Sequence, residues 1–99
     1  MKINDKQYDA PALNFGAMCK LEQWGLQIGD LSSRPLGFLA GFISLATGGD
    51  DLAAGQAAID AHLENGGSLD DLTDALNQAV EESGFFKGAS QEKGEKTPA

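Results

Sequence analysis

A chain of 99 residues, of which 41% are hydrophobic and 22% charged, is long enough for one globular domain with a modest core and too short for two. Its formal net charge is −8, and residues 35–86 contain nine Asp or Glu and no Lys or Arg, which excludes nucleic acid and anionic membranes as partners on charge. The single cysteine, Cys19, cannot form an intramolecular disulfide, so we expect an intracellular protein, or at least one that does not depend on oxidation.

The N-terminal stretch KINDKQYDA is predicted to form a small two-stranded hairpin. Asn4 and Asp5 tolerate the positive φ angles of a tight turn, and Ile3 and Tyr8 lie on either side of them. Strands this short need a helix to lie against. The hairpin should therefore pack on the helices that follow it. This stretch also lacks the apolar segment of a signal peptide.

A first, short amphipathic helix is predicted between Asn14 and Gly25. The asparagine side chain can accept from the free N–H groups of the first turn, and glycine is typical of the left-handed residue that ends a helix. Apolar residues recur at i, i+4 and i+7, which predicts one buried face. The connector that follows carries three apolar anchors for the core, namely Leu26, Ile28 and Leu31.

The segment RPLGFLAGFISLATGG, from Arg34 to Gly49, predicts a helix with apolar residues on every side. It is too short to span a bilayer, which takes about 20 apolar residues. One face holds Leu36, Leu39, Ile43 and Ala46, and another holds Phe38, Phe42 and Leu45. Two interpretations stay open: a core helix covered by its neighbours on all sides, or a core helix with its aromatic face left for a partner.

Two further helices are expected. The first is capped by Asp50 and ends at Gly66; the second is capped by Ser68 and ends at Gly84. The second helix has a clean apolar face, made by Leu69, Leu72, Leu76, Ala79 and Val80.

The C-terminal part combines two adjacent aromatic rings with a polar stretch. Phe85 and Phe86 come just past the last helix, whereas residues 87–99 are polar and carry no apolar anchor, which predicts a disordered tail. The whole pattern predicts a mainly α fold of the α+β class. It has one domain over residues 1–86, with a short N-terminal β-hairpin packed on a bundle of about four short helices.

The sequence contains no recognisable catalytic or metal-binding motif. His62 is the only histidine, and the carboxylates two residues away from it point to different helix faces, so we expect a surface or edge residue. Cys19 lies beside Lys20, which can activate a thiol, but its mostly apolar helix favours a structural cysteine. The acidic clusters lack the spacing of a calcium loop. We therefore expect no enzyme, no cofactor and no metal.

Some large apolar side chains should remain outside the core, because four short helices and a hairpin cannot easily bury them all. An exposed apolar patch usually marks a partner site. The candidate partner-binding residues are Phe38, Phe42, Leu45, Phe85 and Phe86. They would meet a helix of a partner or a second copy of the chain.

The order of these features resembles a family of phage proteins. The stretch KINDKQY is followed by NFGAMCKLEQWGLQIGDL, by the compact apolar helix, and by VEESGFFKG before the polar tail. Over about residues 1–88 this resembles the tail assembly chaperones of long-tailed (siphovirus-type) bacteriophages and prophages. In that family the hairpin turn is typically Asn-Gly, and in this sequence Asp5 stands in place of the glycine. A helix with a Phe–Ala–Leu–Glu rhythm and a Gly-Leu exit then follows, matched by Phe15, Ala17, Leu21, Glu22 and Gly25-Leu26.

The resemblance implies a non-catalytic assembly factor. Such proteins bind the long, helical tape measure protein and keep it soluble while tail tube subunits polymerise around it. They act in the cytoplasm of the bacterial host and are absent from the mature virion. A longer form, often made by ribosomal frameshifting, recruits the tail tube protein, and the polar tail would sit where that extension joins. The alternative is an acyl-carrier-like acidic helical protein with Ser32 or Ser33 as its attachment serine, although the Asp-Ser-Leu order of that family is absent.

Overall fold

The computed structural model describes residues 1–83, and residues 84–99 lie outside the described part of the chain. Two strands, β1 (Lys2–Ile3) and β2 (Lys6–Gln7), form an antiparallel hairpin. Five helices follow within residues 1–83: α1 (Phe15–Gln23), α2 (Asp30–Ser33), α3 (Pro35–Thr47), α4 (Leu52–Glu64) and α5 (Leu69–Glu82). The predicted fold class, a mainly helical chain with a short N-terminal hairpin packed on helices, is confirmed.

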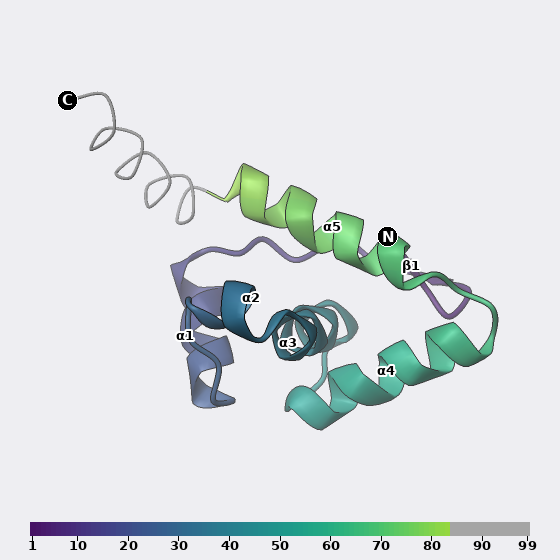
Figure 1. The fold of residues 1–99 in the computed structure, drawn as a ribbon, viewed down its shortest axis with the longest axis horizontal. Coiled ribbons are helices and arrows are strands. Elements are labelled where there is room, and N and C mark those ends of the chain that lie inside the picture. Colours follow the sequence, from purple (N-terminus) through teal and green to yellow (C-terminus); the bar gives the residue numbers. More distant parts are fainter. Residues whose placement is uncertain (84–99) are drawn as a thin grey trace.

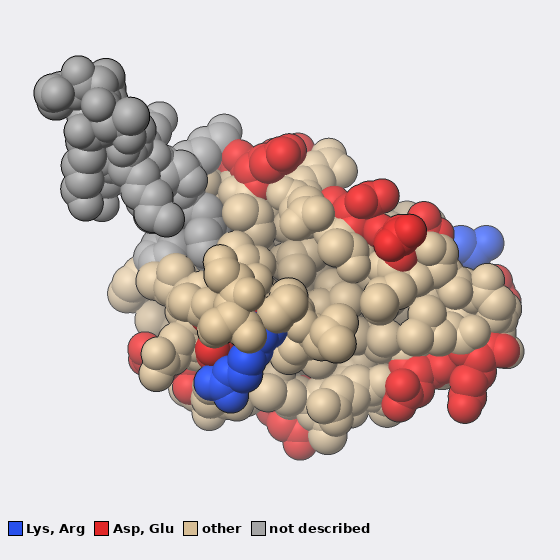
Figure 2. All heavy atoms as spheres, viewed as in Figure 1, with Lys and Arg blue, Asp and Glu red and all other residues tan. Residues whose placement is uncertain are grey.

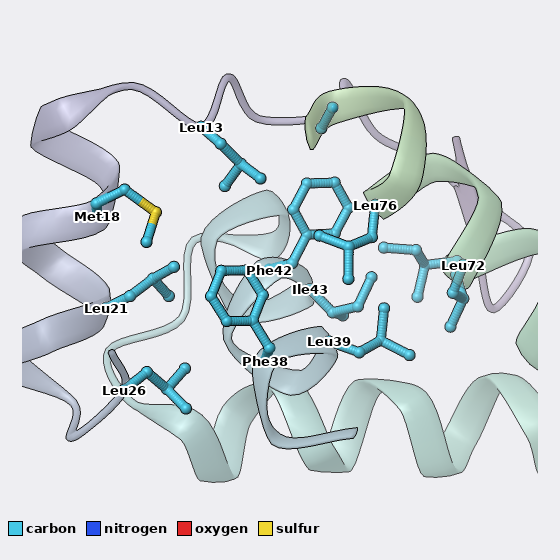
Figure 3. Close-up of a cluster of buried hydrophobic side chains, with 12 residues drawn as sticks. Leu13, Met18, Leu21, Leu26, Phe38, Leu39, Phe42, Ile43, Leu72 and Leu76 are labelled. Carbon is cyan, nitrogen blue, oxygen red and sulfur yellow. The ribbon is translucent and has the colours of Figure 1, made fainter. Parts of the chain in front are cut away.

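Helix α3 lies at the centre of the molecule. Figure 1 views it along its axis, with α1 and α2 on one side, α4 beneath it and α5 above it. Seven consecutive residues of this helix, Phe38–Ser44, are buried. From Phe38 to Ser44, neighbouring elements therefore cover the apolar residues on every side of α3. The cluster of buried side chains around it, most of it labelled in Figure 3, consists of Ile3, Leu13, Met18, Leu21, Leu26, Phe38, Leu39, Phe42, Ile43, Leu72, Leu76 and Ala79.

A glycine lets α4 pack closely against α3. Gly55 is buried, and a Cβ atom at this position would overlap the carbonyl oxygen of Ala40 in α3. The Ser44 hydroxyl also donates a hydrogen bond of 2.6 Å to the carbonyl of Asp51, just before α4 begins. The two helices are thus held together by direct backbone contact and by a buried hydroxyl.

The hairpin turns at Asn4 and Asp5 as predicted, with φ angles of 51° and 67°. Lys2 pairs with Gln7 and Ile3 with Lys6. The turn is fixed to the end of α4, because the Asn4 N–H donates to His62 Nδ1 at 2.8 Å. A hairpin this short is marginal alone, and here it gains stability from that anchor and from the burial of Ile3.

The helix caps at Asn14 and Ser68 are confirmed, since their side chains accept from the N–H groups of Ala17 and Asp70 at 2.9 and 3.1 Å. The expected end at Gly84 lies outside the described residues.

The expected cap at Asp50 is wrong. Helix α4 begins at Leu52, so the neighbouring Asp51 is the residue whose carboxylate reaches an N–H of the first turn, that of Ala54 at 3.0 Å. The connector between the first two predicted helices also differs, because it contains the short helix α2. Ile28 is not an anchor there, since half of its surface, 50%, is exposed.

Candidate partner-binding groove

The residues proposed from the sequence as a partner surface do not form one in the described structure. Phe38 and Phe42 are fully buried, and Leu45 is partly buried and packs against the core. Figure 3 shows the Phe38 ring facing α1 and the Phe42 ring lying between the segment before α1 and α5. The expected open aromatic face is therefore corrected: α1 and α5 cover it. Phe85 and Phe86 lie outside the described residues.

Two other large apolar side chains are exposed on neighbouring helices. Leu36, in the first turn of α3, exposes 68% of its surface, and Leu63, in the last turn of α4, exposes 41%. Both stand where a helix begins or ends, so the neighbouring elements no longer cover them. They border a hollow of about 420 Å³, here called the α3–α4 groove, which is lined by Leu36, Gly37, Leu39, Ala40, Gln56, Ile59, Asp60, Leu63 and Leu69.

The groove is built from side chains at helical spacing. Leu39 and Ala40 lie three and four residues after Leu36 on α3, and Leu63 lies four residues after Ile59 on α4. Residues at these spacings share one helix face. Two helix ridges therefore border the hollow, with Gly37 and Ala40 leaving space between them. Both residues come from α3, and because neither carries a large side chain, this side of the groove stays open.

The surroundings of the groove are acidic. Asp60 lines the groove, and Glu64, Asp70 and Asp71 are exposed at the adjacent end of α4 and start of α5. The sequence from residue 35 to residue 83 contains no Lys or Arg. Figure 2 shows Asp and Glu side chains along α4 and along α5, with an uncharged surface between them. Arg34, just before α3, is paired with Asp30.

Asp30 is a buried carboxylate that fixes the start of α3. It accepts from the Gln27 N–H at 2.8 Å and from Arg34 Nε at 3.0 Å. The Gln27 N–H, helped by the Arg34 guanidinium, holds the pKa of Asp30 below its usual value, although burial opposes this shift. Arg34 directly precedes Pro35, so this ion pair joins α2 to the residue just before α3.

His62 is buried, with 6% of its surface exposed, rather than lying at the surface as expected. Its Nδ1 accepts from Asn4 N–H at 2.8 Å, so Nε2 carries the proton and donates to the Ser68 carbonyl at 3.2 Å. Gly67 packs directly on the ring, since a Cβ atom there would overlap it. With both nitrogens bonded, the imidazole joins the hairpin to the α4–α5 loop, and neither nitrogen is open to a substrate.

A second hollow, of about 680 Å³, lies between residues 10–15 and α5. Its lining ends at Ser83, the last described residue, and the Ser83 hydroxyl donates to the Leu13 carbonyl. The chain continues from the edge of this hollow, whereas all elements around the α3–α4 groove are described. The candidate site is therefore the α3–α4 groove.

Within residues 1–83, no group of three or more His, Cys, Asp or Glu side chains is placed to hold a metal ion, and every buried side-chain nitrogen or oxygen has a hydrogen-bond partner. None of the helices in this range is both long and apolar enough to cross a membrane. No family model matches the chain, and neither a curated protein nor a solved structure matches it.

Proposed function

We propose that this protein is a tail assembly chaperone of a long-tailed bacteriophage or prophage. In this role it binds the tape measure protein and keeps it soluble during assembly of the tail tube, without catalysing a reaction. The observation that carries the proposal is the α3–α4 groove, an aliphatic hollow with two exposed leucines on a strongly acidic body. The order of sequence features over about residues 1–88 supports the same family.

The groove and the charge suit the two demands on such a chaperone. A helical client that aggregates through its apolar face needs a surface that covers this face, and a groove between two helices can hold a third. The complex must itself stay in solution, and a net charge of −8 keeps copies of the chain apart. In this proposal the protein acts in the host cytoplasm and leaves before the virion is complete. A frameshift-extended form would join at the C-terminal stretch and recruit the tail tube protein.

Co-expression tests the proposal. The candidate client is the long, helical tape measure protein encoded in the same phage genome, produced with this chain or with an unrelated acidic protein of similar size. We expect the client to move from the pellet to the supernatant only with this chain, and to co-elute with it in gel filtration. A client that is equally insoluble with both proteins contradicts the proposed function.

Intact mass separates this proposal from the acyl-carrier alternative. The chain is produced together with a phosphopantetheinyl transferase and weighed. In the structure the Ser33 hydroxyl donates to the Gly29 carbonyl at 3.0 Å, and we expect an unchanged mass. A fixed mass gain on Ser32 or Ser33 would favour the carrier protein.

A further inference from the structure

We propose that the α3–α4 groove binds a single amphipathic helix whose apolar ridge is flanked by Lys or Arg side chains. The inference rests on the proposed function, and it names the binding site and the chemical character of the client segment. It follows from the shape of the groove, from the exposed leucines on its borders and from the sign of the charges around it.

The shape of the groove favours a helix over an extended strand or a small ligand. Leu36 and Leu63 project from two different helices, and Leu39 and Ala40 between them are buried. Gly37 and Ala40 line the floor of the hollow without large side chains that would fill it. Side chains at i, i+3, i+4 and i+7 of a partner helix would enter such a hollow as ridges enter grooves. The described sheet is only the hairpin, with two strands of two residues each, and neither strand lines the groove.

The charges select which helix binds. Asp60 lies in the lining, and the exposed carboxylates of Glu64, Asp70 and Asp71 stand on the adjacent helix ends. A helix with basic flanks is attracted to this rim, whereas one with acidic flanks is repelled. Because salt screens contacts between exposed charges, the attraction should weaken as ionic strength rises.

A second copy of the chain fits this surface less well than a basic client. Each copy carries a formal net charge of −8, and the groove of one copy would approach acidic helices of the other. Like charges brought together oppose association. The same argument disfavours an anionic membrane. The occupant is therefore a partner helix, and dimerisation through the groove is an outcome that the experiment must be able to report.

The test uses the full chain and four variants. Leu36→Gln and Leu63→Gln remove the exposed apolar side chains but keep a good helix former. Ile28→Gln is the matched control, because Ile28 is as exposed as these leucines and lies outside the groove lining. Asp60→Lys reverses the charge in the groove. The probes are the co-expressed tape measure protein and two designed Leu-rich helical peptides, one with Lys flanks and one with Glu flanks.

We expect the Lys-flanked peptide to bind the wild-type chain and to shift the amide NMR signals of groove residues, while the Glu-flanked peptide binds at least tenfold more weakly. Each leucine variant should lose about tenfold or more in affinity, the size typical of a central anchor. Asp60→Lys should weaken binding of the Lys-flanked peptide and flatten its salt dependence, and Ile28→Gln should change neither. Far-UV circular dichroism confirms that each variant is folded.

Each result decides the matter. If the tape measure protein binds the wild type and both leucine variants equally, the groove assignment is overturned and the proposed function stands. If only the Lys-flanked peptide binds, through the leucines, the groove assignment stands and the proposed function fails. Peptide binding that ignores the leucines overturns the assignment, as does a wild-type dimer that becomes a monomer in Leu36→Gln.

Discussion

Replacing Gly55 with alanine should force α3 and α4 apart. The added Cβ atom would overlap the Ala40 carbonyl oxygen and lie 2.7 Å from the Ala40 carbonyl carbon, where ordinary contact begins at 3.4 Å. These atoms belong to the backbone of a buried helix, so they cannot rotate away as a side chain could. Relieving the contact with the carbon alone requires a separation of at least 0.7 Å, the difference between these two distances.

The free energy lost through overpacking in Gly55→Ala can be weighed against the free energy gained from the higher helix propensity of alanine. Overpacking a well-packed interior costs about 1–3 kcal/mol, and a gap of about 0.5–1 Å already forfeits a quarter to a half of the dispersion energy of a contact. We take about 3 kcal/mol, because a whole helix pair must separate rather than one side chain. Alanine in place of glycine inside a helix returns about 1 kcal/mol. The net loss is about 2 kcal/mol, which for a domain of this size lowers Tm by about 8–16 °C.

Thermal unfolding followed by circular dichroism measures this loss, and Gly37→Ala is the matched control. Gly37 also lies inside α3, but a Cβ atom there meets only Leu26 Cδ2, at the ordinary distance of 3.9 Å. This variant should be as stable as the wild type or gain up to about 1 kcal/mol. If Gly55→Ala melts at or above the wild-type temperature, the close approach of α3 and α4 does not limit stability and the reasoning is refuted.

Three further predictions concern the polar contacts and the hairpin. Asp30→Asn should lower Tm at pH 7. Because the folded-state pKa of Asp30 is depressed, the difference in Tm from wild type should persist above about pH 4 and shrink as the pH falls through the folded-state pKa. A difference in Tm that grows in acid would contradict this. His62→Ala leaves the Asn4 N–H without its acceptor and should cost about 1–3 kcal/mol, with faster hydrogen exchange of the Asn4 amide; unchanged exchange would show that His62 is not the anchor. Asp5→Gly places glycine at a φ of 67° and should raise stability by up to about 1 kcal/mol in urea unfolding, whereas a loss would mean that the aspartate side chain supports the turn.

Much of the fold follows from local sequence chemistry. Asn4 and Asp5 adopt the positive φ angles that these residue types tolerate. Asn14 caps its helix with its amide oxygen, and Ser68 caps its helix with its hydroxyl oxygen. The apolar residues on every side of α3 predict a central helix, because such a helix is stable in water only where neighbouring elements bury it. Helix boundaries are less predictable. Asp50 and Asp51 are adjacent and either side chain could cap α4, and in the structure Asp51 is the cap.

The groove could not be predicted from the periodicity of the sequence. Leu36 shares a helix face with Leu39, so the pattern predicts that both are buried. In the structure Leu39 is buried and Leu36 is largely exposed. What separates them is where α4 ends and α5 begins, a property of tertiary packing rather than of α3. The prediction that His62 lies at the surface is wrong for a similar reason, because its hydrogen-bond partner, Asn4, is 58 residues away in the sequence. Long-range contacts of this kind leave no local signal.

The bond between Asn4 and His62 also has a consequence for the order of synthesis. The hairpin leaves the ribosome before its anchor, which follows 58 residues later, and at about 5–20 residues per second this corresponds to a delay of about 3–12 s. Leu63 directly follows His62, and Leu69 is the last residue of the groove lining in the chain, so the groove is completed only after the residue that fastens the hairpin has been made. A nascent chain therefore cannot offer a finished groove before its hairpin can be anchored.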